Sequence, residues 1–402
     1  MARRIGHWAR AAVLGARTAW DILGITLLLL VVVVIIGRGA ASLLRAEPPP
    51  SPPHPYGGQP WFRGLRYEYV NSNRMQWEPY VQWRRRPYTG PQGNVNIDSA
   101  GLRRTTQPAA STASPRKVFF FGGSTMWGSW QRDSFTIASL VAADLAARGV
   151  DDIEVRNYGE TGYVLTQEVI RLILELRRGE RPALVVFYDG INDIAAEGMN
   201  LRCGLPQNEA NRRLEFAAGR LLARRSRVEI RDAAQAWRDR YRVPPARSVD
   251  DSTAAALARD AVACYAGTAE VVEALARAYG FQVLYFWQPT IGASEKPLTA
   301  FERYELDPPD GDIDGVPIAR PIERASMRYI DSAMGAVAGD RFHNLGALFA
   351  GDTATVWLDF IGHITERANQ VVAGRIAEPV YRQLQSASPS AATAGSNARA
   401  TR

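Results

Sequence analysis

Three uninterrupted apolar runs restrict the fold of this 402-residue chain more than any other feature. They are KVFFF at residues 117–121, ALVVFY at residues 183–188 and QVLYFW at residues 282–287. A strand with apolar side chains on both faces is typical of the buried centre of a parallel sheet. We therefore predict that each run is a central strand with helices packed on both faces.

Segments with helical spacing alternate with these runs, and two shorter strands complete the pattern. The helices are expected at Phe135–Arg148, Val164–Leu176 and Thr365–Gln385, and the shorter strands at Ile153–Asn157 and Phe342–Leu345. Such alternation indicates an α/β fold, in which a doubly wound parallel sheet lies between two helical layers. The prediction is a three-layer α/β domain over residues 116–385.

Two segments depart from a minimal α/β pattern. Residues 205–280 are rich in arginine and helical, and we expect them to be an insertion between the third and fourth strands. Residues 61–115 form a lead-in that carries many aromatic residues. These aromatics either cap the edge of the sheet or form the wall of a groove that stacks on sugar rings; capping is the more common use.

The N-terminal part of the chain predicts a membrane anchor at residues 18–37. Its centre is an uncharged apolar run, and about 20 residues cross a bilayer core of ~30 Å. The basic residues before the run are Arg3, Arg4, Arg10 and Arg17, and those after it are Arg38 and Arg45. This asymmetry predicts a single-pass protein of the bacterial inner membrane, with residues 1–17 in the cytoplasm and the remainder in the periplasm. A cleaved signal peptide is the alternative.

Two further segments are expected to lack a packed fold of their own. Residues 38–60 contain six prolines between positions 48 and 55, which predicts a stiff linker that holds the next domain off the membrane. Residues 386–402 show no apolar periodicity, and we predict a disordered tail.

Charge and cysteine content argue against some function classes. The net charge is +7, but the basic residues are dispersed and no nucleic-acid-binding motif accompanies them, so nucleic acid is not an expected partner. Cys203 and Cys264 lie in the part that we expect to be exported, where a disulfide can form, and the bridge is slightly favoured over two free thiols. Neither a CxxC motif nor a nearby histidine accompanies them, so no metal site is expected.

Residues suited to acyl transfer follow three of the predicted strands. Gly-Gly-Ser-Thr at residues 122–125 follows the first, Asn-Tyr-Gly-Glu-Thr-Gly at residues 157–162 the second and Gly-Ile-Asn-Asp at residues 190–193 the third. Ligands of parallel sheets bind beyond the carboxyl ends of the strands. A serine hydroxyl, a glycine N–H and an asparagine amide at that edge would supply a nucleophile and oxyanion donors.

A general base is the remaining requirement of such chemistry. Histidine is scarce, and the chain contains only His7, His54, His343 and His363. The first two precede the predicted α/β domain, and the third lies in a short strand, where a structural role is expected. His363 lies just before the last helix and has Asp359 nearby to orient it, so we expect it to take the proton of Ser124.

In this order, the four blocks resemble the SGNH (GDSL-like) hydrolase superfamily, including its membrane-anchored bacterial members. The resemblance covers residues 117–193 and 355–375, about a quarter of the chain. It implies a flavodoxin-like three-layer α/β fold, which agrees with the strand pattern. It implies no metal or organic cofactor.

The resemblance also implies a role for each matching residue. Ser124 would be the nucleophile, and His363 would be the general base and then the general acid. The oxyanion hole would be formed by the N–H of Ser124, the N–H of Gly162 and the side chain of Asn192. Gly159 would then serve the turn, since the spacing favours the later glycine as donor.

The chain departs from the family pattern at two further positions. Gly123 stands where the name motif has aspartate. Asp359 precedes His363 by four residues, one more than the family spacing. Either a bulge at Ile361–Gly362 restores the geometry, because glycine can adopt unusual backbone angles, or another group orients the histidine.

Three functions are compatible with these features. The first is a membrane-anchored, periplasm-facing serine esterase acting on acyl or O-acetyl esters of small molecules or of cell-envelope or exported polysaccharide. The second is an O-acyltransferase of the same fold that works with a membrane acyl-donor protein. The third is a non-catalytic envelope-assembly module with a degenerate site, which only the displaced Asp359 supports.

Overall fold

The computed structural model describes residues 20, 22–37, 51–207, 209–222, 249–306 and 316–386. These residues belong to two units, Met1–Pro50 and Ser51–Arg402. In the first unit, residues 22–37 are helical and exposed. None of the helices in the described ranges is both long and apolar enough to span a bilayer.

Several predicted segments lie partly or wholly outside the described residues. They are the cytoplasmic segment at 1–17, the beginning of the predicted anchor at 18–37, the first part of the linker at 38–50 and the tail beyond residue 386. The described part of the linker, residues 51–60, belongs to the second unit and packs against its α/β domain. Tyr56 is buried there, and its hydroxyl accepts the backbone N–H of Glu366 at 2.6 Å. This stretch is therefore docked on the domain, within the range in which the sequence predicts a stiff linker.

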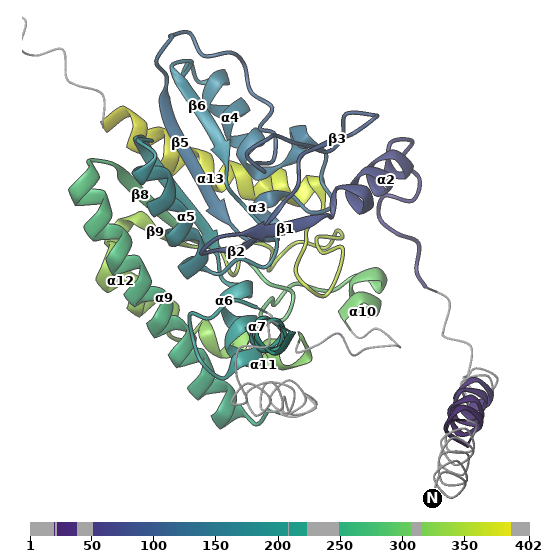
Figure 1. The fold of residues 1–402 in the computed structure, drawn as a ribbon. Coiled ribbons are helices and arrows are strands. Elements are labelled where there is room, and N and C mark those ends of the chain that lie inside the picture. Colours follow the sequence, from purple (N-terminus) through teal and green to yellow (C-terminus); the bar gives the residue numbers. More distant parts are fainter. Residues whose placement is uncertain are drawn as a thin grey trace, which may run out of the picture. The chain divides into compact units, whose positions relative to one another are not determined.

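A five-stranded parallel sheet forms the centre of the second unit (Figure 1). Its strands are β5 (Arg116–Gly122), β6 (Ile153–Asn157), β7 (Pro182–Asp189), β8 (Gln282–Trp287) and β9 (Phe342–Asn344). Their order is β6-β5-β7-β8-β9, and all four neighbouring pairs are parallel. The chain direction across the sheet reverses between β5 and β7, which is where open α/β sheets bind ligands. The predicted doubly wound, flavodoxin-like sheet is confirmed.

Helices cover both faces of the sheet. One face packs on α4 (Ile137–Ala147) and α13 (Glu366–Ser386), and the other packs on α5 (Leu165–Arg177), α9 (Asp251–Tyr279) and α12 (Ile330–Ala338). In β5, Val118 and Phe120 pack in the first core. Phe119 and Phe121 pack in the second. Because both faces are buried, the strand needs no polar residues at alternate positions.

The segment between β7 and β8 differs in part from the predicted insertion. It contains α6 (Ile191–Asn200), α7 (Glu209–Leu222) and the long α9. Ala258, Ala269 and Val272 of α9 are buried in the core beside the sheet. This helix is therefore one of the layer helices, so the segment at 205–280 is only partly an addition to the fold. Among the described residues between β8 and β9, the α-helices are α10 (Ala300–Leu306), α11 (Val316–Ser326) and α12 (Ile330–Ala338).

The lead-in consists of one helix and two small antiparallel strand pairs. The helix is α2 (Phe62–Ser72), one pair is β1 (Met75–Glu78) with β2 (Gln82–Arg85), and the other is β3 (Tyr88–Thr89) with β4 (Asn96–Ile97). Some of its aromatics are packed and others are exposed. Trp61, Tyr69 and Tyr88 pack in a small core around Trp127, whereas Trp77 and Tyr80 are 64% and 72% exposed.

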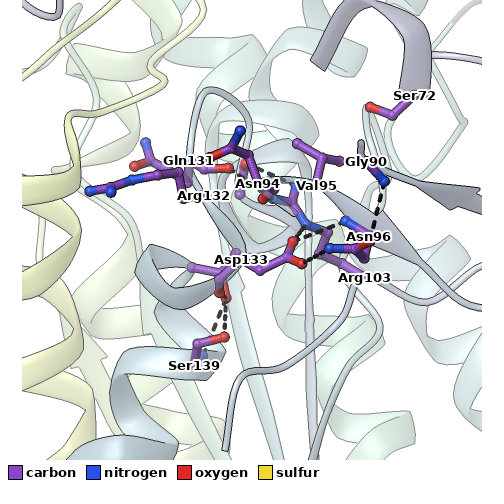
Figure 2. Close-up of polar contacts among 12 residues, drawn as sticks. Ser72, Gly90, Asn94, Val95, Asn96, Arg103, Gln131, Arg132, Asp133 and Ser139 are labelled. Carbon is purple, nitrogen blue, oxygen red and sulfur yellow. Dashed lines mark hydrogen bonds and ion pairs between the residues drawn. The ribbon is translucent and has the colours of Figure 1, made fainter. Parts of the chain in front are cut away.

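A buried ion pair attaches the lead-in to the α/β domain. The guanidinium of Arg103 donates to Asp133 Oδ1 at 2.6 Å, and the side chain of Asn96 donates to Asp133 Oδ2 at 2.7 Å (Figure 2). Arg103 also donates to the backbone carbonyls of Asn94 and Gln131. A buried guanidinium needs such partners because burial removes the water that would otherwise solvate its charge. These contacts hold the lead-in beside α3 (Ser124–Trp127), the helix that follows β5.

Candidate active site

Ser124 begins a short helix at the end of the first sheet strand. β5 ends at Gly122, Gly123 is extended, and α3 starts at the next residue. A Cβ at Gly123 would lie 2.0 Å from Asn192 Nδ2, so a larger residue there would displace the Asn192 amide.

The structure brings Ser124, His363 and Asp359 into one hydrogen-bonded row. His363 Nε2 lies 2.7 Å from Ser124 Oγ, and His363 Nδ1 lies 2.6 Å from Asp359 Oδ2. A carboxylate only accepts hydrogen bonds, so Nδ1 carries the proton and Nε2 is left to accept from the serine hydroxyl. Ser124 and His363 are only 5% and 6% exposed. The row has the polarity of a nucleophile, a base and an orienting acid.

Asp359 reaches His363 because the loop between them folds back on the carboxylate. Asp359 Oδ1 accepts the backbone N–H groups of Ile361 and His363, both at 3.1 Å. Gly362 has φ of +93°, a left-handed conformation that glycine adopts without strain. The N–H of Leu358 then donates to the carbonyl of His363 at 2.7 Å. The turn at Gly362 thus accommodates the additional residue, and it removes the one feature that supported a degenerate site.

The other strand ends bring the expected oxyanion donors next to α3. The N–H of Ser124 lies at the first position of a helix, where it has no intrahelical partner. Asn192 Nδ2 lies against Gly123 and donates to the carbonyl of Tyr163 at 2.8 Å, which places the residue after Gly162 beside the same turn. An amide nitrogen has two hydrogens, so one donor of Asn192 remains for a substrate oxygen.

The turn after β6 also fixes the position of α3. Asn157 Nδ2 donates to the carbonyl of Met126 at 2.9 Å, and Asn157 Oδ1 accepts the N–H of Gly159 at 2.9 Å. A Cβ at Gly159 would overlap the backbone nitrogen of Trp127. Gly159 therefore serves the packing of the turn, and the positioning role of Asn157 is one that the sequence did not reveal.

Two buried arginines lie against the ring of Trp127, three residues after the serine. The Arg85 and Arg103 guanidinium carbons are 3.8 and 4.4 Å from the centre of its ring. Arg85 also donates to Thr161 Oγ1 at 2.6 Å, and its backbone N–H donates to Glu160 at 2.8 Å. Burial raises the pKa of Glu160, and the nearby Arg85 opposes that shift. The lead-in thus holds both α3 and the turn that carries Gly162.

Three acids, Glu168, Asp189 and Asp193, form a buried group between α5, β7, α6 and α9. Burial raises the pKa of Glu168 and of Asp189 well above their ordinary values, and their mutual charge adds to the effect at Glu168. Burial also raises the pKa of Asp193 to about 7. Tyr265 donates to Asp189 Oδ2 at 3.3 Å. Asp193 Oδ1 accepts the N–H of Leu165 at the start of α5 at 3.1 Å, a capping role on a helix other than its own.

These acids do not form a metal site. In the described ranges, no cluster of three or more His, Cys, Asp or Glu side chains is arranged to hold a metal ion. Asp189 ends β7, and its neighbours there are a tyrosine and two other acids. A sequence signal for this group was present in α5, where Glu168 lies on the same helical face as the buried Leu165 and Leu172.

The predicted disulfide between Cys203 and Cys264 is not formed, and both residues are free thiols. The prediction rested on the compartment and not on geometry. The two side chains are nevertheless neighbours, since burial and a hydrogen bond with Cys203 raise the pKa of Cys264 to about 12. The thiol of Cys264 also packs on the loop after α6, where a Cβ at Gly204 would be 3.0 Å from its sulfur.

A cavity of about 360 Å³ opens beside Gly162. Its lining includes Gln76, Trp77, Trp83, Gln207 and Arg212. The indole N–H of Trp83 donates to the carbonyl of Thr161 at 2.9 Å, and Trp83 O accepts from the hydroxyl of Tyr163. The lead-in hairpin therefore forms one wall of the space next to an expected oxyanion donor.

Comparisons with solved structures return esterases and a lipolytic protein, at low similarity. The acetyl xylan esterase AlAXEase is 14% identical, with a TM-score of 0.36, over 66% of this chain and 99% of that chain. A putative lipolytic protein of the G-D-S-L family from Desulfitobacterium hafniense is 8% identical, with a TM-score of 0.35, over 65% and 98%. TesA is 20% identical, with a TM-score of 0.33, over 68% and 99%. No protein-family model and no curated protein matches the chain.

Proposed function

We propose that the chain is a serine ester hydrolase of the SGNH type that works through an acyl-enzyme intermediate. The observation that carries the proposal is the row from Asp359 through His363 to Ser124, with contacts of 2.6 and 2.7 Å. This row stands at the edge of the sheet where ligands bind in α/β folds. An unactivated serine is a weak nucleophile, and an adjacent base held by an acid is the standard means of activating it.

The residues suggest the following sequence of steps. Ser124 Oγ attacks the ester carbonyl while His363 Nε2 takes its proton. The N–H groups of Ser124 and Gly162 and the amide of Asn192 stabilise the negative oxygen that forms. His363 then gives the proton to the leaving alcohol, and the same histidine later activates the water that releases the acid. Each oxyanion donor contributes about 3–4 kcal/mol to such a transition state.

The substrate class that we propose is an acyl or O-acetyl ester of a small molecule or of a cell-envelope or exported polysaccharide. Support comes from the cavity beside Gly162, which offers the rings of Trp77 and Trp83 together with the amides of Gln76 and Gln207. Aromatic walls with a few polar groups suit a ligand with both apolar faces and hydroxyls. Transfer to an acceptor supplied with an acyl-donor protein is the alternative outcome of the same chemistry, and no contact among the described residues favours it.

We further propose that residues 18–37 anchor the chain in the inner membrane, with the hydrolase domain in the periplasm. The uncharged run and the basic residues before it support this location. Protease added to intact spheroplasts should degrade the domain, whereas protection until lysis would place the domain in the cytoplasm. Recovery of the domain in the soluble periplasmic fraction would indicate a cleaved signal peptide.

The function is tested by substituting the proposed nucleophile in the full chain, purified in detergent. Ser124→Ala should lower the hydrolysis of p-nitrophenyl acetate roughly a thousandfold or more and abolish labelling by a fluorophosphonate. Ser134→Ala, at an exposed serine ten residues away, is the matched control and should behave as wild type. The catalytic proposal fails if Ser124→Ala and wild type are alike in both assays. Faster turnover on adding a sugar acceptor would favour transfer over hydrolysis.

A further inference from the structure

One side chain from outside the four sequence blocks contacts two of the three proposed oxyanion donors. Gln207 Nε2 donates to Asn192 Oδ1 at 3.2 Å. The same residue lies against Gly162, where a Cβ would be 3.2 Å from Gln207 Oε1. Gln207 is only partly exposed and lines the cavity beside Gly162.

The direction of these hydrogen bonds is fixed by a backbone group. The carbonyl of Tyr163 can only accept, so the nitrogen of the Asn192 amide must face it, at 2.8 Å. Asn192 Oδ1 must then face Gln207, and Gln207 must present its nitrogen to that oxygen. Rotation of the Asn192 amide by half a turn would break both bonds and would bring two pairs of like groups together.

The loop that carries Gln207 is itself held in place. Leu201 has a left-handed conformation at the end of α6, and Asn200 Nδ2 donates to the carbonyl of Pro206 at 3.1 Å. Gly204, with φ of +70°, packs on the thiol of Cys264 in α9. Gln207 therefore approaches Asn192 from a defined position, whereas a side chain on an unsupported loop would not constrain a neighbour.

We propose that Gln207 is a positioning residue that holds the Asn192 amide with its free N–H directed at the substrate oxyanion. The inference rests on the proposed hydrolase function, because it assigns a partner to one of the oxyanion donors. An Asn amide has a broad, roughly two-fold terminal torsion. Without Gln207 it is held only through Nδ2 at the carbonyl of Tyr163, and its free N–H is aimed less sharply than the transition state requires. Gln207 itself does not contact the reacting atoms.

The test is a double-mutant cycle on kcat in the full chain. Asn192→Ala alone should lower kcat about 100-fold or more, as loss of an oxyanion donor does. Gln207→Met keeps the length of the side chain without the donor, and it should lower kcat about tenfold. In the Asn192→Ala background, Gln207→Met should change kcat less than twofold, because nothing remains to be positioned. Gln207→Glu should lower kcat more than Gln207→Met, since a carboxylate repels Asn192 Oδ1 and attracts its nitrogen.

Two controls separate this role from a structural one. Gln107→Met removes a glutamine that also makes two hydrogen bonds, both to the backbone of Val155, and should leave kcat unchanged. Unfolding midpoints of all variants show whether a loss of kcat is a loss of folded protein. An equal factor for Gln207→Met in both backgrounds would overturn the positioning role while the hydrolase proposal stands. If Asn192→Ala has no effect on kcat, its oxyanion assignment fails, and the role of Gln207 fails with it.

Discussion

Two groups of buried ionisable side chains lie near the carboxyl ends of the strands, and their charges are compensated in different ways. In the lead-in group, Arg103 pairs with Asp133 at 2.6 Å, and both side chains are almost fully buried. In the acidic group, Glu168, Asp189 and Asp193 have one another as neighbours, and no described Lys or Arg forms an ion pair with them. A cation compensates the acid of the first group, whereas burial without such a cation raises the pKa values of the acids in the second.

The contrast shows that burial alone does not determine the charge of an acid, because the neighbouring groups contribute as well. Removing a carboxylate from water disfavours the charged form at either place. At Asp133 the guanidinium and two N–H groups of Asn96 replace the lost water. At Asp193 one oxygen accepts a single N–H and the other, Oδ2, is buried without a partner, so its pKa is raised to about 7. The same substitution should therefore have opposite effects in the two groups.

The largest effect is expected at an aspartate that belongs to neither group. Asp359→Asn should lower kcat roughly 1,000- to 10,000-fold, because an amide can hold His363 in the wrong tautomer. Its unfolding free energy should change by less than about 1 kcal/mol, since the loop N–H groups keep an acceptor. Steady-state hydrolysis and urea unfolding of the same preparation give the two values. An unchanged rate would show that another group orients His363.

The next largest effect is expected in the paired group. Asp133→Asn should lower the unfolding free energy by about 3–5 kcal/mol, because Arg103 is left with an uncompensated buried charge. Urea unfolding followed by tryptophan fluorescence measures the change. The double variant Arg103→Met/Asp133→Leu should lose less unfolding free energy than Asp133→Asn. An equal or larger loss in the double variant would mean that packing, and not charge, holds this region together.

The acidic group should respond in the opposite direction and with pH. Asp193 keeps its proton in the folded chain up to about pH 7, whereas the unfolded chain loses it near pH 4, so this contribution to stability is lost as the pH rises through 7. The effect of Asp193→Asn on the unfolding free energy should therefore be measured at pH 5 and at pH 8. The value at pH 8 should be more stabilising by about 1 kcal/mol or more. A difference that does not depend on pH would show that Asp193 is already charged at pH 5.

The smallest effect is expected at a thiol beside the acidic group. Burial and Cys203 raise the pKa of Cys264 to about 12, and the charges of Asp193 and Glu197 add to the shift. Alkylation of Cys264 in the native chain at pH 8, followed by peptide mass mapping, should be far slower than that of a free thiol. Asp193→Asn should accelerate it about two- to threefold. Native alkylation as fast as in urea would contradict this environment.

The central sheet was predictable because each strand carries its own evidence. Val118 to Phe121 must be buried on both faces, and only a strand between two layers offers that environment. The position of Ser124 was predictable as well, because ligands of parallel sheets bind beyond the carboxyl ends of the strands and Ser124 follows such an end. Asp359 was harder, because the turn that returns it to His363 depends on the conformation of Gly362.

Features that depend on distant contacts were not predictable from local pattern. The prolines between residues 48 and 55 indicate stiffness, but they cannot show that residues 51–60 dock through Tyr56 on the start of α13. Gln207 reads as one polar residue in a loop, and only the fold brings it to Asn192. Glu168 and Asp193 read as ordinary helix residues, and their surroundings come from three other elements. In each case the missing information was the identity of the neighbour.

The hydrogen bond between Ser124 and His363 joins residues that are 239 positions apart. During synthesis at about 5–20 residues per second, the histidine follows the serine by roughly 10–50 s. Over that interval a growing chain can form β5, β6 and the turn around Ser124 without any base to activate the hydroxyl. Ser124 therefore becomes reactive late in the synthesis and folding of each chain. Its reactivity begins when the segment that carries His363 has docked on the rest of the domain.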